Sequence, residues 1–493
     1  MIIDAVLAAA DGATPPRIGS FIGGRLEEAG AGATLPTRDP ATGALLAEVA
    51  EAGADGVARA VAAATAAAPG WRRTPARDRA ALIGELARRI AAQAEKLALL
   101  DSLDTGNPLT AMAADVTKGV RLMGDAAGVA LEIAGRTYPL PGLHYTTREP
   151  WGVVARMVTF NHPVMFTCAR LATALVAGNA VIVKPSELAP LGPLAIGELT
   201  AGLLPDGLVS VVAGGPATGE ALVRHPAIER ITFTGSTATA LRIQAAAAAS
   251  GRMKTLTFEL GGKNPIVVFP DVDVDEVAGA IVRGMNYTRV QGQSCGSTSR
   301  LVIHASIADA VLERVARKAA AIRIGMPRDP ETEMGALITP AARDRCLAVV
   351  ERATADGARL LTGGRIPADP ALAAGAFLEP TVLAGVAPGS EAADEEVFGP
   401  ILSALTFTEE AEAIALANAG RYGLTAAVWS REIDRAFRVV DALEAGYVWV
   451  NDVETRFPAV PFGGWRDSGV GTEHGLDEVL SMTRTRAVNV RLR

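Results

Sequence analysis

The stretch "AVIVKPSELAPLGPLAIGELTAGLLPDGLVSVVAG", residues 180–214, carries two short β-branched runs, one at each end. "AVIVK" and "LVSVVAG" are apolar and bounded by turn residues, which is typical of buried strands. The segment between them, Leu191–Leu203, is expected to be helical. A strand, a helix and a second strand in this order predict a parallel βαβ unit.

The same pattern continues on both sides of this unit. Further β-branched runs are "VVARMV", "RITFTG" and "TLTFEL", and the helical segments beside them are residues 164–175, 218–223 and 237–249. Strands that alternate with helices indicate a doubly wound, nucleotide-binding α/β architecture. Two amphipathic helices are predicted upstream, over residues 54–71 and 76–100. A second α/β block is predicted from Asp271 to about Val440.

Composition narrows the class of protein. The chain has 493 residues, 49% of them apolar, which is enough for two or three domains with large cores. A net charge of −7 argues against a nucleic-acid partner. Three cysteines cannot form a disulfide framework and predict a reduced, cytoplasmic compartment. Five scattered histidines show no metal-ligand spacing, and no apolar run is long enough to span a membrane.

One cysteine stands in unusual surroundings. The segment "VQGQSCGSTSR", residues 290–300, places Cys295 among glycine, glutamine and serine, whereas a structural cysteine would have apolar neighbours. We therefore interpret Cys295 as presented for chemistry, with buried packing as the alternative. Cys168 and Cys346 lie in helical stretches and are expected to be buried.

The nucleotide-binding signals are less direct. The first turn of the sheet, "TFNHP", lacks the G-x-G-x-x-G fingerprint, and the one glycine turn onto a helix is Gly235-Ser236-Thr237. The second strand ends in "VIVKPSE", with Lys184, Ser186 and Glu187. An acidic residue at such a strand end can bind ribose hydroxyls. An ordinary solvated Lys/Glu pair is the alternative interpretation.

Six motifs, taken together and in order, resemble those of the aldehyde dehydrogenase superfamily. They are "TFNHP" (159–163), "FTGST" (233–237), "TFELGGKNP" (257–265), "GQSC" (292–295), "EEVFGP" (395–400) and "PFGGWRDSGVG" (461–471). The resemblance runs from about Phe21 to Arg484. It implies an α/β fold with a Rossmann-like parallel-sheet cofactor domain, an α/β catalytic domain and a small β oligomerisation arm.

The resemblance also suggests domain boundaries. Residues 1–131 and 150–260 would form the cofactor-binding domain, residues 261–465 the catalytic domain, and residues 132–149 and 478–493 the oligomerisation arm. Both arm segments have an alternating, strand-like pattern. We expect a homodimer or homotetramer, because the last strand would otherwise leave an open edge. Two ordinary surface strands are the alternative.

Three catalytic roles follow from the resemblance. Cys295 would be the nucleophile, forming a thiohemiacetal and then a thioester. Asn161 would stabilise the oxyanion together with the backbone N–H of Cys295, although an asparagine at such a turn can also be a helix N-cap. Glu259 would activate water for deacylation, with a surface glutamate as the alternative. Family members that transfer the acyl group to coenzyme A lack this glutamate, so its presence favours hydrolysis.

The cofactor implied by the resemblance is NAD, with NADP possible. Its expected binding residues are Lys184, Ser186, Glu187, Gly235, Ser236, Glu396 and Phe398. The helix after Gly235 departs from the family at Ala240, where a second glycine is usual.

The substrate side departs from the family more clearly. Arg289 and Arg456 stand where many relatives have aromatic residues, and His162 replaces an aromatic residue of the asparagine turn. Members that oxidise succinic semialdehyde also carry an arginine at the position of Arg289, but their second arginine is Ala169 here. The two arginines could bind an anionic substrate tail, point to solvent, or pair with an acid such as Glu454.

The function implied is oxidation of a small-molecule aldehyde to the carboxylic acid, with no nucleic-acid or membrane partner. Two alternatives stay open: a coenzyme A-acylating semialdehyde dehydrogenase, and a non-catalytic binding descendant of the fold. Loss of the thiol, the glutamate or the asparagine would favour the non-catalytic alternative, and all three residues are present.

Overall fold

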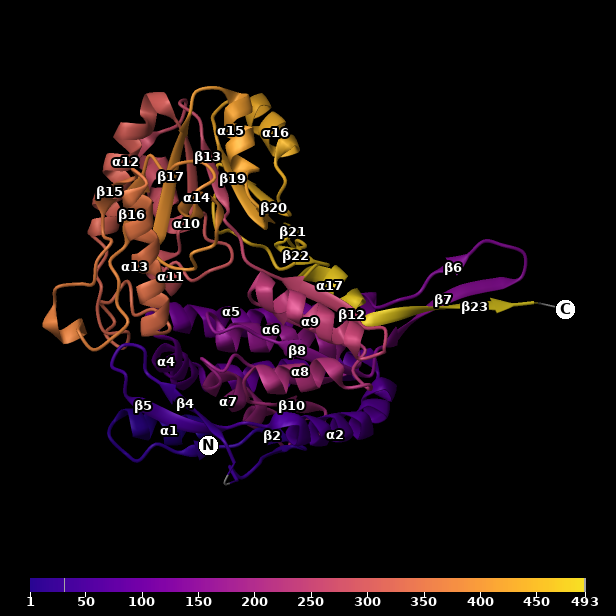
Figure 1. Ribbon diagram of the computed structural model, residues 1–493. Coiled ribbons are helices and arrows are strands. Elements are labelled where there is room, and N and C mark those ends of the chain that lie inside the picture. The colour runs from indigo at the N-terminus through magenta and orange to yellow at the C-terminus, as the bar shows by residue number, and fades with distance from the viewer. Residues whose placement is uncertain (31, 492–493) are drawn as a thin grey trace.

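The computed structural model describes residues 1–30 and 32–491. Ala31, Leu492 and Arg493, which belong to the predicted cofactor domain and arm, lie outside the described residues. Two α/β units, each built on its own sheet, lie against each other, and a narrow β arm projects from them (Figure 1). The mixed α/β fold with parallel sheets is the predicted fold class.

The first sheet contains the five predicted β-branched runs as neighbouring parallel strands. Short antiparallel strands extend both of its edges. Its order is β22 (Gly469–Val470), β12 (Thr255–Glu259), β11 (Arg230–Thr234), β8 (Val153–Met157), β9 (Ala180–Lys184), β10 (Val209–Val211), β2 (Phe21–Ile22) and β3 (Arg25–Leu26). The chain reverses its direction of travel across the sheet after β10, and β11 takes the free side of β8. Ligands of such sheets bind at the carboxyl ends of the strands at this switch point.

The helices of this unit also follow the sequence pattern. They are α6 (Pro163–Val176), α7 (Leu191–Thr200), α8 (Pro216–Arg224) and α9 (Thr237–Ala249). Proline occupies the start of α6 and of α8, where its missing N–H costs no hydrogen bond. Helix α7 ends three residues earlier than predicted, before Gly202, whose φ of +65° cannot continue a helix.

One upstream prediction was wrong in its extent. The predicted helix over residues 76–100 is two helices, α3 (Ala76–Ala91) and α4 (Ala94–Thr105), broken at Gln93. Both helices pack mainly on α5 (Leu109–Gly128), and both also contact α6 and α7. Gln93 has a φ of −110° and a ψ of 14°, which lie outside the helical range and interrupt the helix there. The other predicted helix is α2 (Gly53–Arg73).

The second unit is a seven-stranded sheet, parallel except for its edge strand β15. Its order is β15 (Arg359–Thr362), β16 (Thr381–Ala384), β17 (Ile401–Phe407), β14 (Arg300–His304), β13 (Pro265–Val268), β19 (Thr425–Trp429) and β20 (Tyr447–Val450). Its helices are α10 (Val274–Gly284), α11 (Tyr287–Val290), α12 (Ala305–Ala320), α13 (Pro340–Ala355), α14 (Glu391–Asp394), α15 (Glu410–Ala417) and α16 (Ile433–Ala442).

Smaller elements complete the chain. Helix α1 (Ile2–Ala10) precedes a three-stranded sheet of β1 (Arg17–Ile18), β4 (Thr34–Arg38) and β5 (Leu45–Ala50), and β18 (Tyr422–Gly423) pairs with β21 (Trp465–Arg466). The late segment then returns to the first unit, where β22 pairs with β12 and α17 (Gly475–Ser481) packs on α5 and α6.

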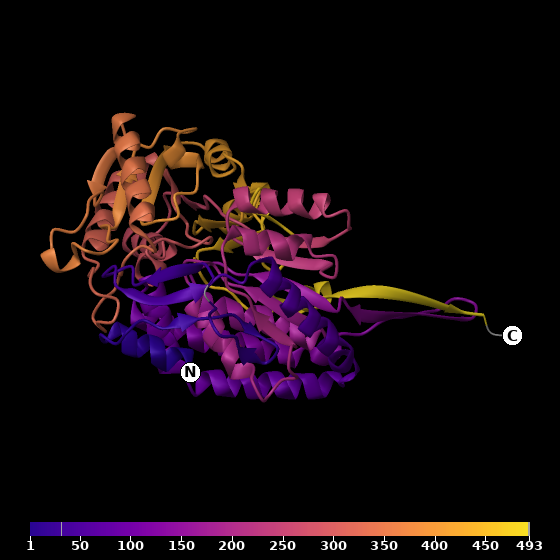
Figure 2. The ribbon, with the colours of Figure 1, turned by 60° about the horizontal axis from the view of Figure 1, so that its bottom comes forward.

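The arm is a three-stranded antiparallel sheet that points away from both units in two views (Figures 1 and 2). It comprises β6 (Thr137–Tyr138), β7 (Leu143–Pro150) and β23 (Thr483–Val490), and β23 pairs with β7 along its whole length. Residues 478–481, included above in the predicted arm, form the end of α17. Within the described residues, no helix is both long and apolar enough to cross a membrane.

Candidate active site

The loop that carries Cys295 is held in an uncommon backbone conformation. After α11, Gln291 and Gly292 both adopt a positive φ, +53° and +72°. At Gly292 a Cβ atom would stand 2.3 Å from the carbonyl oxygen of Gly399, so only glycine fits. The side chain of Asn264 donates hydrogen bonds to the carbonyl oxygens of Cys295, at 2.7 Å, and Ser297, at 2.8 Å. These contacts fix the position of the thiol.

Cys295 is partly exposed, whereas Cys168 and Cys346 are buried. The Glu259 carboxylate, at the end of β12, lies in the same cavity as the Cys295 thiol and interacts with it. Burial raises the pKa of the thiol well above its usual range, Glu259 raises it further, and Arg456 opposes both. The resting thiol is therefore protonated at neutral pH, and its activation requires a base.

Glu259 is positioned as such a base. Its side chain is 2% exposed, and its Oε1 makes no hydrogen bond within the described chain. Burial raises its pKa, against the lowering effects of the Cys295 thiol, Arg170 and Arg456. A carboxylate with a raised pKa, beside a thiol, can accept a proton near neutral pH. The interpretation of Glu259 as an ordinary surface glutamate does not fit this burial.

Asn161 lies in the turn between β8 and α6 and is 2% exposed. Its Nδ2 donates to the carbonyl oxygen of Gln293 at 2.8 Å, which leaves a second amide hydrogen for another acceptor. The N-cap position of α6 is His162, and no side chain caps the helix there. Asn161 is therefore not an N-cap, and it lines the same cavity as Cys295 and Glu259.

Cys295 stands where two cavities meet. The larger, of about 330 Å³, lies at the switch point of the first sheet and is lined by four of the predicted cofactor residues: Gly235, Ser236, Glu396 and Phe398. The smaller, of about 50 Å³, is lined by the predicted substrate residues Arg289, Arg456 and His162. The larger can be called the cofactor cavity and the smaller the outer cavity.

The cofactor cavity has features suited to a phosphate and a ribose. Gly235 and Ser236 precede α9, whose N-terminal amides carry partial positive charge. Ser236 caps α9 by accepting the N–H of Thr239 at 3.3 Å. Burial raises the pKa of Glu396 to about 7, and its Oε1 accepts the backbone N–H of Gly262 at 3.1 Å. Ala240 is buried on α9, and the helix keeps its place over the sheet without the usual glycine.

The other predicted cofactor residues lie beside this cavity. Leu188 lines the cofactor cavity, but three residues just before it do not. These are Lys184, the last residue of β9, and Ser186 and Glu187, which follow the strand. Lys184 Nζ lies 3.7 Å from Glu187 Oε2 and donates to the carbonyl oxygen of Pro185 at 2.9 Å. Burial lowers the pKa of Lys184, and Glu187 opposes this. The two side chains thus form an ion pair at the strand end.

In the outer cavity, Arg289 and His162 share one buried acid. Asp115, on α5, accepts from Arg289 Nη2 at 2.6 Å through Oδ1 and bonds to His162 Nδ1 through Oδ2. Burial lowers the pKa of His162, so its neutral ring donates the Nδ1 proton to Asp115. Burial alone would raise the pKa of Asp115, but His162 and Arg289 lower it to about 2. Arg289 is therefore paired, although with Asp115 and not with Glu454.

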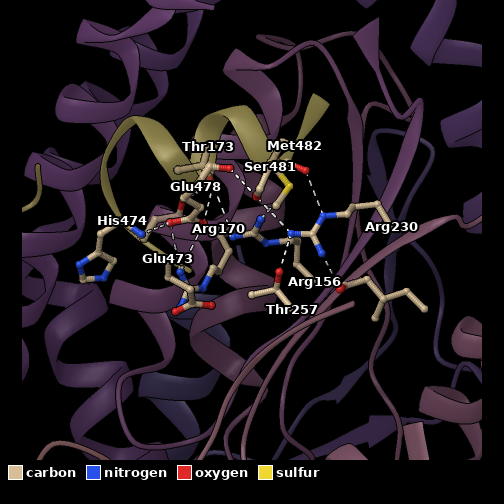
Figure 3. A network of polar contacts seen from close by, with 12 residues as sticks. Arg156, Arg170, Thr173, Arg230, Thr257, Glu473, His474, Glu478, Ser481 and Met482 are labelled. Atoms are coloured by element: carbon tan, nitrogen blue, oxygen red, sulfur yellow. Dashed lines mark hydrogen bonds and ion pairs between the residues drawn. The ribbon is translucent and has the colours of Figure 1, made fainter. Parts of the chain in front are cut away.

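A buried ion network joins residues of β8, α6 and α17 (Figure 3). Arg170, on α6, donates to Glu473 and Glu478, and Arg156, on β8, donates to Glu478 as well. Burial raises the pKa of Glu473 to about 7, with Arg170 lowering it and Glu259 raising it. The charge of Arg170 in turn lowers the pKa of Glu259. The charge of Arg170 thus couples α17 to Glu259.

Sequence reasoning missed Lys118, which lines the outer cavity, and Asp115, which pairs with Arg289 in the wall of the cavity. Asp115 and Lys118 lie one turn apart on α5, about 180 positions before Cys295. The available signal was an acid and a base inside a largely apolar helix. Such a pair usually faces solvent, and only the packing of α5 on α6 turns it towards the site.

The chain is similar to known proteins over almost its full length. Residues 27–488 match the sequence model of the aldehyde dehydrogenase family. The aldehyde dehydrogenase tropH of Talaromyces stipitatus is 41% identical over 92% of this chain and 90% of its own length. A betaine aldehyde dehydrogenase of Cereibacter sphaeroides is 39% identical over 96% of this chain and 97% of its own.

Solved structures agree with these matches. PnpE from Pseudomonas sp. WBC-3, in complex with nicotinamide adenine dinucleotide, is 40% identical, with a TM-score of 0.93 over 96% of this chain and 97% of its own. A betaine aldehyde dehydrogenase from Staphylococcus aureus, in complex with NAD+, is 30% identical, with a TM-score of 0.92 over 96% of this chain and 94% of its own.

Proposed function

The chain belongs to the aldehyde dehydrogenase family and is an oxidoreductase that acts on aldehydes, and we propose that it forms a thioester on Cys295 and hydrolyses it to the free acid. The observation that carries this proposal is that the Cys295 thiol and the buried Glu259 carboxylate line one cavity, and that Cys295 also lines the neighbouring one.

The first step is attack of the thiol on the aldehyde carbon. Glu259 takes the thiol proton, the S–C bond forms, and the carbonyl oxygen becomes an oxyanion. Hydride leaves a neutral aldehyde poorly, but collapse of this oxyanion expels it and leaves the thioester on Cys295. The step needs a stabilised oxyanion as much as a nucleophile.

Two donors are available for the oxyanion. The second amide hydrogen of Asn161 is free of the contact to Gln293. The backbone N–H of Cys295 makes no hydrogen bond among the described residues. Losing one such donor typically costs about a hundred- to a thousandfold in rate.

The second step is hydrolysis. Glu259, once it has lost the first proton to solvent, removes a proton from water, which attacks the thioester carbon and releases the acid and the thiol. A base with a raised pKa suits this step, because its conjugate acid forms readily near neutral pH. A coenzyme A-acylating enzyme needs no such base, so Glu259 favours hydrolysis over that alternative.

The cofactor cavity fits a nicotinamide dinucleotide. A Cβ at Gly261 would stand 2.0 Å from Glu396 Oε2, so glycine at this position lets the carboxylate face the cavity. Gly235 and Ser236 would hold the pyrophosphate, Glu396 and Phe398 the nicotinamide ribose, and Lys184, Ser186 and Glu187 the adenosine ribose. NAD, when bound, accepts the hydride. Two relatives with TM-scores of 0.92 and 0.93 bind it in their crystal structures, which supports NAD here, with NADP as a weaker substitute.

Product analysis tests the proposal. With an aldehyde and NAD, but without coenzyme A, the enzyme should form carboxylic acid and reduced cofactor in equal amounts. Cys295→Ala should abolish this activity, whereas Cys346→Ala, which removes a buried thiol elsewhere, should retain it. A requirement for coenzyme A would establish the acylating alternative, and no turnover of any aldehyde would favour a non-catalytic descendant.

We also infer that the arm assembles copies of the chain into a homodimer or homotetramer. Its three strands leave open edges that another copy can cover. A cytoplasmic location is inferred from the three free cysteines, which suit a reducing compartment. The proposed division into domains is supported by the two sheets and the arm. The chain passes from the first sheet to the second between β12 and β13.

A further inference from the structure

Cationic side chains outnumber acidic ones among the residues that line the outer cavity. Four cationic side chains line it, from α5, α6, α11 and the segment after β20: Lys118, Arg170, Arg289 and Arg456. Arg170 has the carboxylates of Glu473 and Glu478, and Arg289 has Asp115. Glu454 is the one acid among the lining residues; burial raises its pKa, whereas Arg289 and Arg456 lower it.

Lys118 has no partner of its own. Its ammonium group makes no ion pair or hydrogen bond among residues 1–30 and 32–491. Burial, together with the charges of Arg289 and Arg456, lowers its pKa to about 8. Lys118 is half-buried, and an ammonium group near like charges is stabilised by an anion that enters the cavity.

Arg456 is held beside the nucleophile. Its guanidinium stacks on the ring of Phe462, 4.1 Å from the ring centroid. A Cβ at Gly296 would stand 1.9 Å from Arg456 Nη2, so the glycine that follows Cys295 makes room for the guanidinium. No ion pair or hydrogen bond of Arg456 occurs within the part of the chain that the structure describes. Its planar donors are therefore available, beside the loop that carries Cys295, for the bidentate contact that guanidinium makes with carboxylate.

We propose, on the basis of the proposed function, that the outer cavity binds the carboxylate of a short aldehyde acid, with Lys118 and Arg456 as its partners. Asp115 holds Arg289 and His162 in the wall, so these two residues shape the site rather than supply a free charge. A volume of about 50 Å³ has room for roughly four water-sized groups, which suits a chain of a few carbons.

The same geometry argues against a cationic aldehyde. Quaternary ammonium groups are bound by open aromatic faces. Phe166 is the one phenylalanine, tyrosine or tryptophan that lines the cavity, and Arg170 lies over its ring, 5.6 Å from the centroid. Arg456 covers the ring of Phe462 in the same way. The outer cavity therefore lacks the open aromatic faces that a trimethylammonium substrate needs, although two relatives of this chain are named betaine aldehyde dehydrogenases.

The test compares three aldehydes that differ in charge. They are 4-oxobutanoate, its uncharged analogue of equal size 4-methylpentanal, and trimethylammonioacetaldehyde. The wild-type enzyme should show its highest kcat/KM with 4-oxobutanoate and its lowest with the cation. Lys118→Met and Arg456→Gln should each lower the ratio of kcat/KM for 4-oxobutanoate to that for 4-methylpentanal, by roughly ten- to a hundredfold.

The matched controls make the same two substitutions, Lys to Met and Arg to Gln, at exposed positions. Lys318→Met and Arg252→Gln should leave the ratio at its wild-type value. Preference of the wild type for 4-methylpentanal, or an unchanged ratio in both cavity variants, would overturn the proposal while aldehyde oxidation itself stands.

A binding measurement separates the two proposals further. Calorimetry should detect succinate binding to the wild-type enzyme and its weakening in Lys118→Met. If no aldehyde is oxidised but succinate binds in this way, the anion site stands and the proposed function fails. If aldehydes are oxidised and succinate does not bind, the anion site is wrong.

Discussion

At the scale of single residues, each of three side chains has one task in the proposed mechanism. Cys295 is presented by a loop in a left-handed conformation, Asn161 is locked by the carbonyl of Gln293, and Glu259 is buried at a strand end. Each is rigid for a different reason, but all three line one cavity. The pKa values of these groups and their unused hydrogen-bond donors and acceptors indicate which of them moves a proton. Residue type alone does not.

Glu259→Gln should uncouple the two steps. Hydrolysis needs the base in every turnover, so steady-state kcat should fall about a hundred- to ten-thousandfold. The first release of reduced cofactor should be slow at neutral pH, because the thiol keeps its proton, and should recover at alkaline pH as the thiol ionises. Stopped-flow absorbance measures both. A steady-state rate equal to wild type would remove Glu259 from the mechanism.

The same residue sets the acid limb of the pH profile. Only the deprotonated carboxylate acts as a base, and burial raises its pKa. Wild-type kcat should therefore fall, as the pH is lowered, at a higher pH than an ordinary glutamate would allow.

Glu187 should govern the choice between NAD and NADP. Its carboxylate follows the end of β9, lies 3.7 Å from Lys184 and would repel a 2′-phosphate, while Lys184 offsets part of that repulsion. The wild type should have the higher kcat/KM with NAD, and Glu187→Ala should narrow the gap. Glu313→Ala, an exposed acid on α12, serves as the control. A wild type that prefers NADP would contradict this role.

At the scale of elements, the site depends on how α17 docks against α6 and β8. Glu478, on α17, is the shared carboxylate of Arg156 and Arg170 (Figure 3). Burial would raise its pKa, but the two arginines and His474 lower it well below the usual range. A short helix near the end of the chain is thus tied to the sheet that carries Glu259.

Glu478→Gln should destabilise the fold. It leaves two buried guanidinium groups with too little negative charge, which typically costs about 3–5 kcal/mol. The exposed pair of Arg484 and Glu229 provides the control, since Glu229→Gln should cost about 0–1 kcal/mol. Thermal unfolding of both variants at pH 7 measures the difference, and equal Tm values would contradict the importance of the network.

The pH dependence of this contribution has a definite sign. Because the folded-state pKa of Glu478 is depressed, its contribution is complete above the unfolded-state value near 4.5 and is lost as the pH falls towards the folded-state value. Wild type and Glu478→Gln should therefore converge in stability under acidic conditions.

At the scale of the whole molecule, the arm stands apart from the two units. It buries little of its own surface, since most residues of β23 are exposed. A sheet of three strands with both edges open gains stability by pairing with another copy. The arm is therefore the part of the chain most suited to assembly.

Removal of residues 485–493 should reduce the size of the assembly. The truncated chain should keep both core sheets, because β23 pairs only with β7 among the described strands. Light scattering should show a larger species for the full chain than for the truncated one, with similar circular dichroism. An unchanged mass would exclude the last strand as an assembly element.

Much of the local structure was predictable. The parallel order of β-branched runs and helices, the glycine turn before α9 and the presentation of Cys295 all depend on neighbouring residues, and sequence patterns report such local preferences well. The prediction of one helix over residues 76–100 was wrong, because the helix is interrupted at Gln93. The helices on either side, α3 and α4, pack on α5, α6 and α7, which follow them in the chain, so the local sequence does not show the interruption.

Motif order and strand periodicity depend on adjacent residues, so they were enough to predict the fold class and to nominate the reacting groups. Only the tertiary structure decided the electrostatics of the site. Asp115 forms an ion pair with Arg289, Lys118 has no ion-pair partner among the described residues, and Glu259 interacts with the Cys295 thiol. These residues lie on separate elements. Burial and charge pairing arise from packing across long sequence separations, and such contacts leave no periodic signal in the chain.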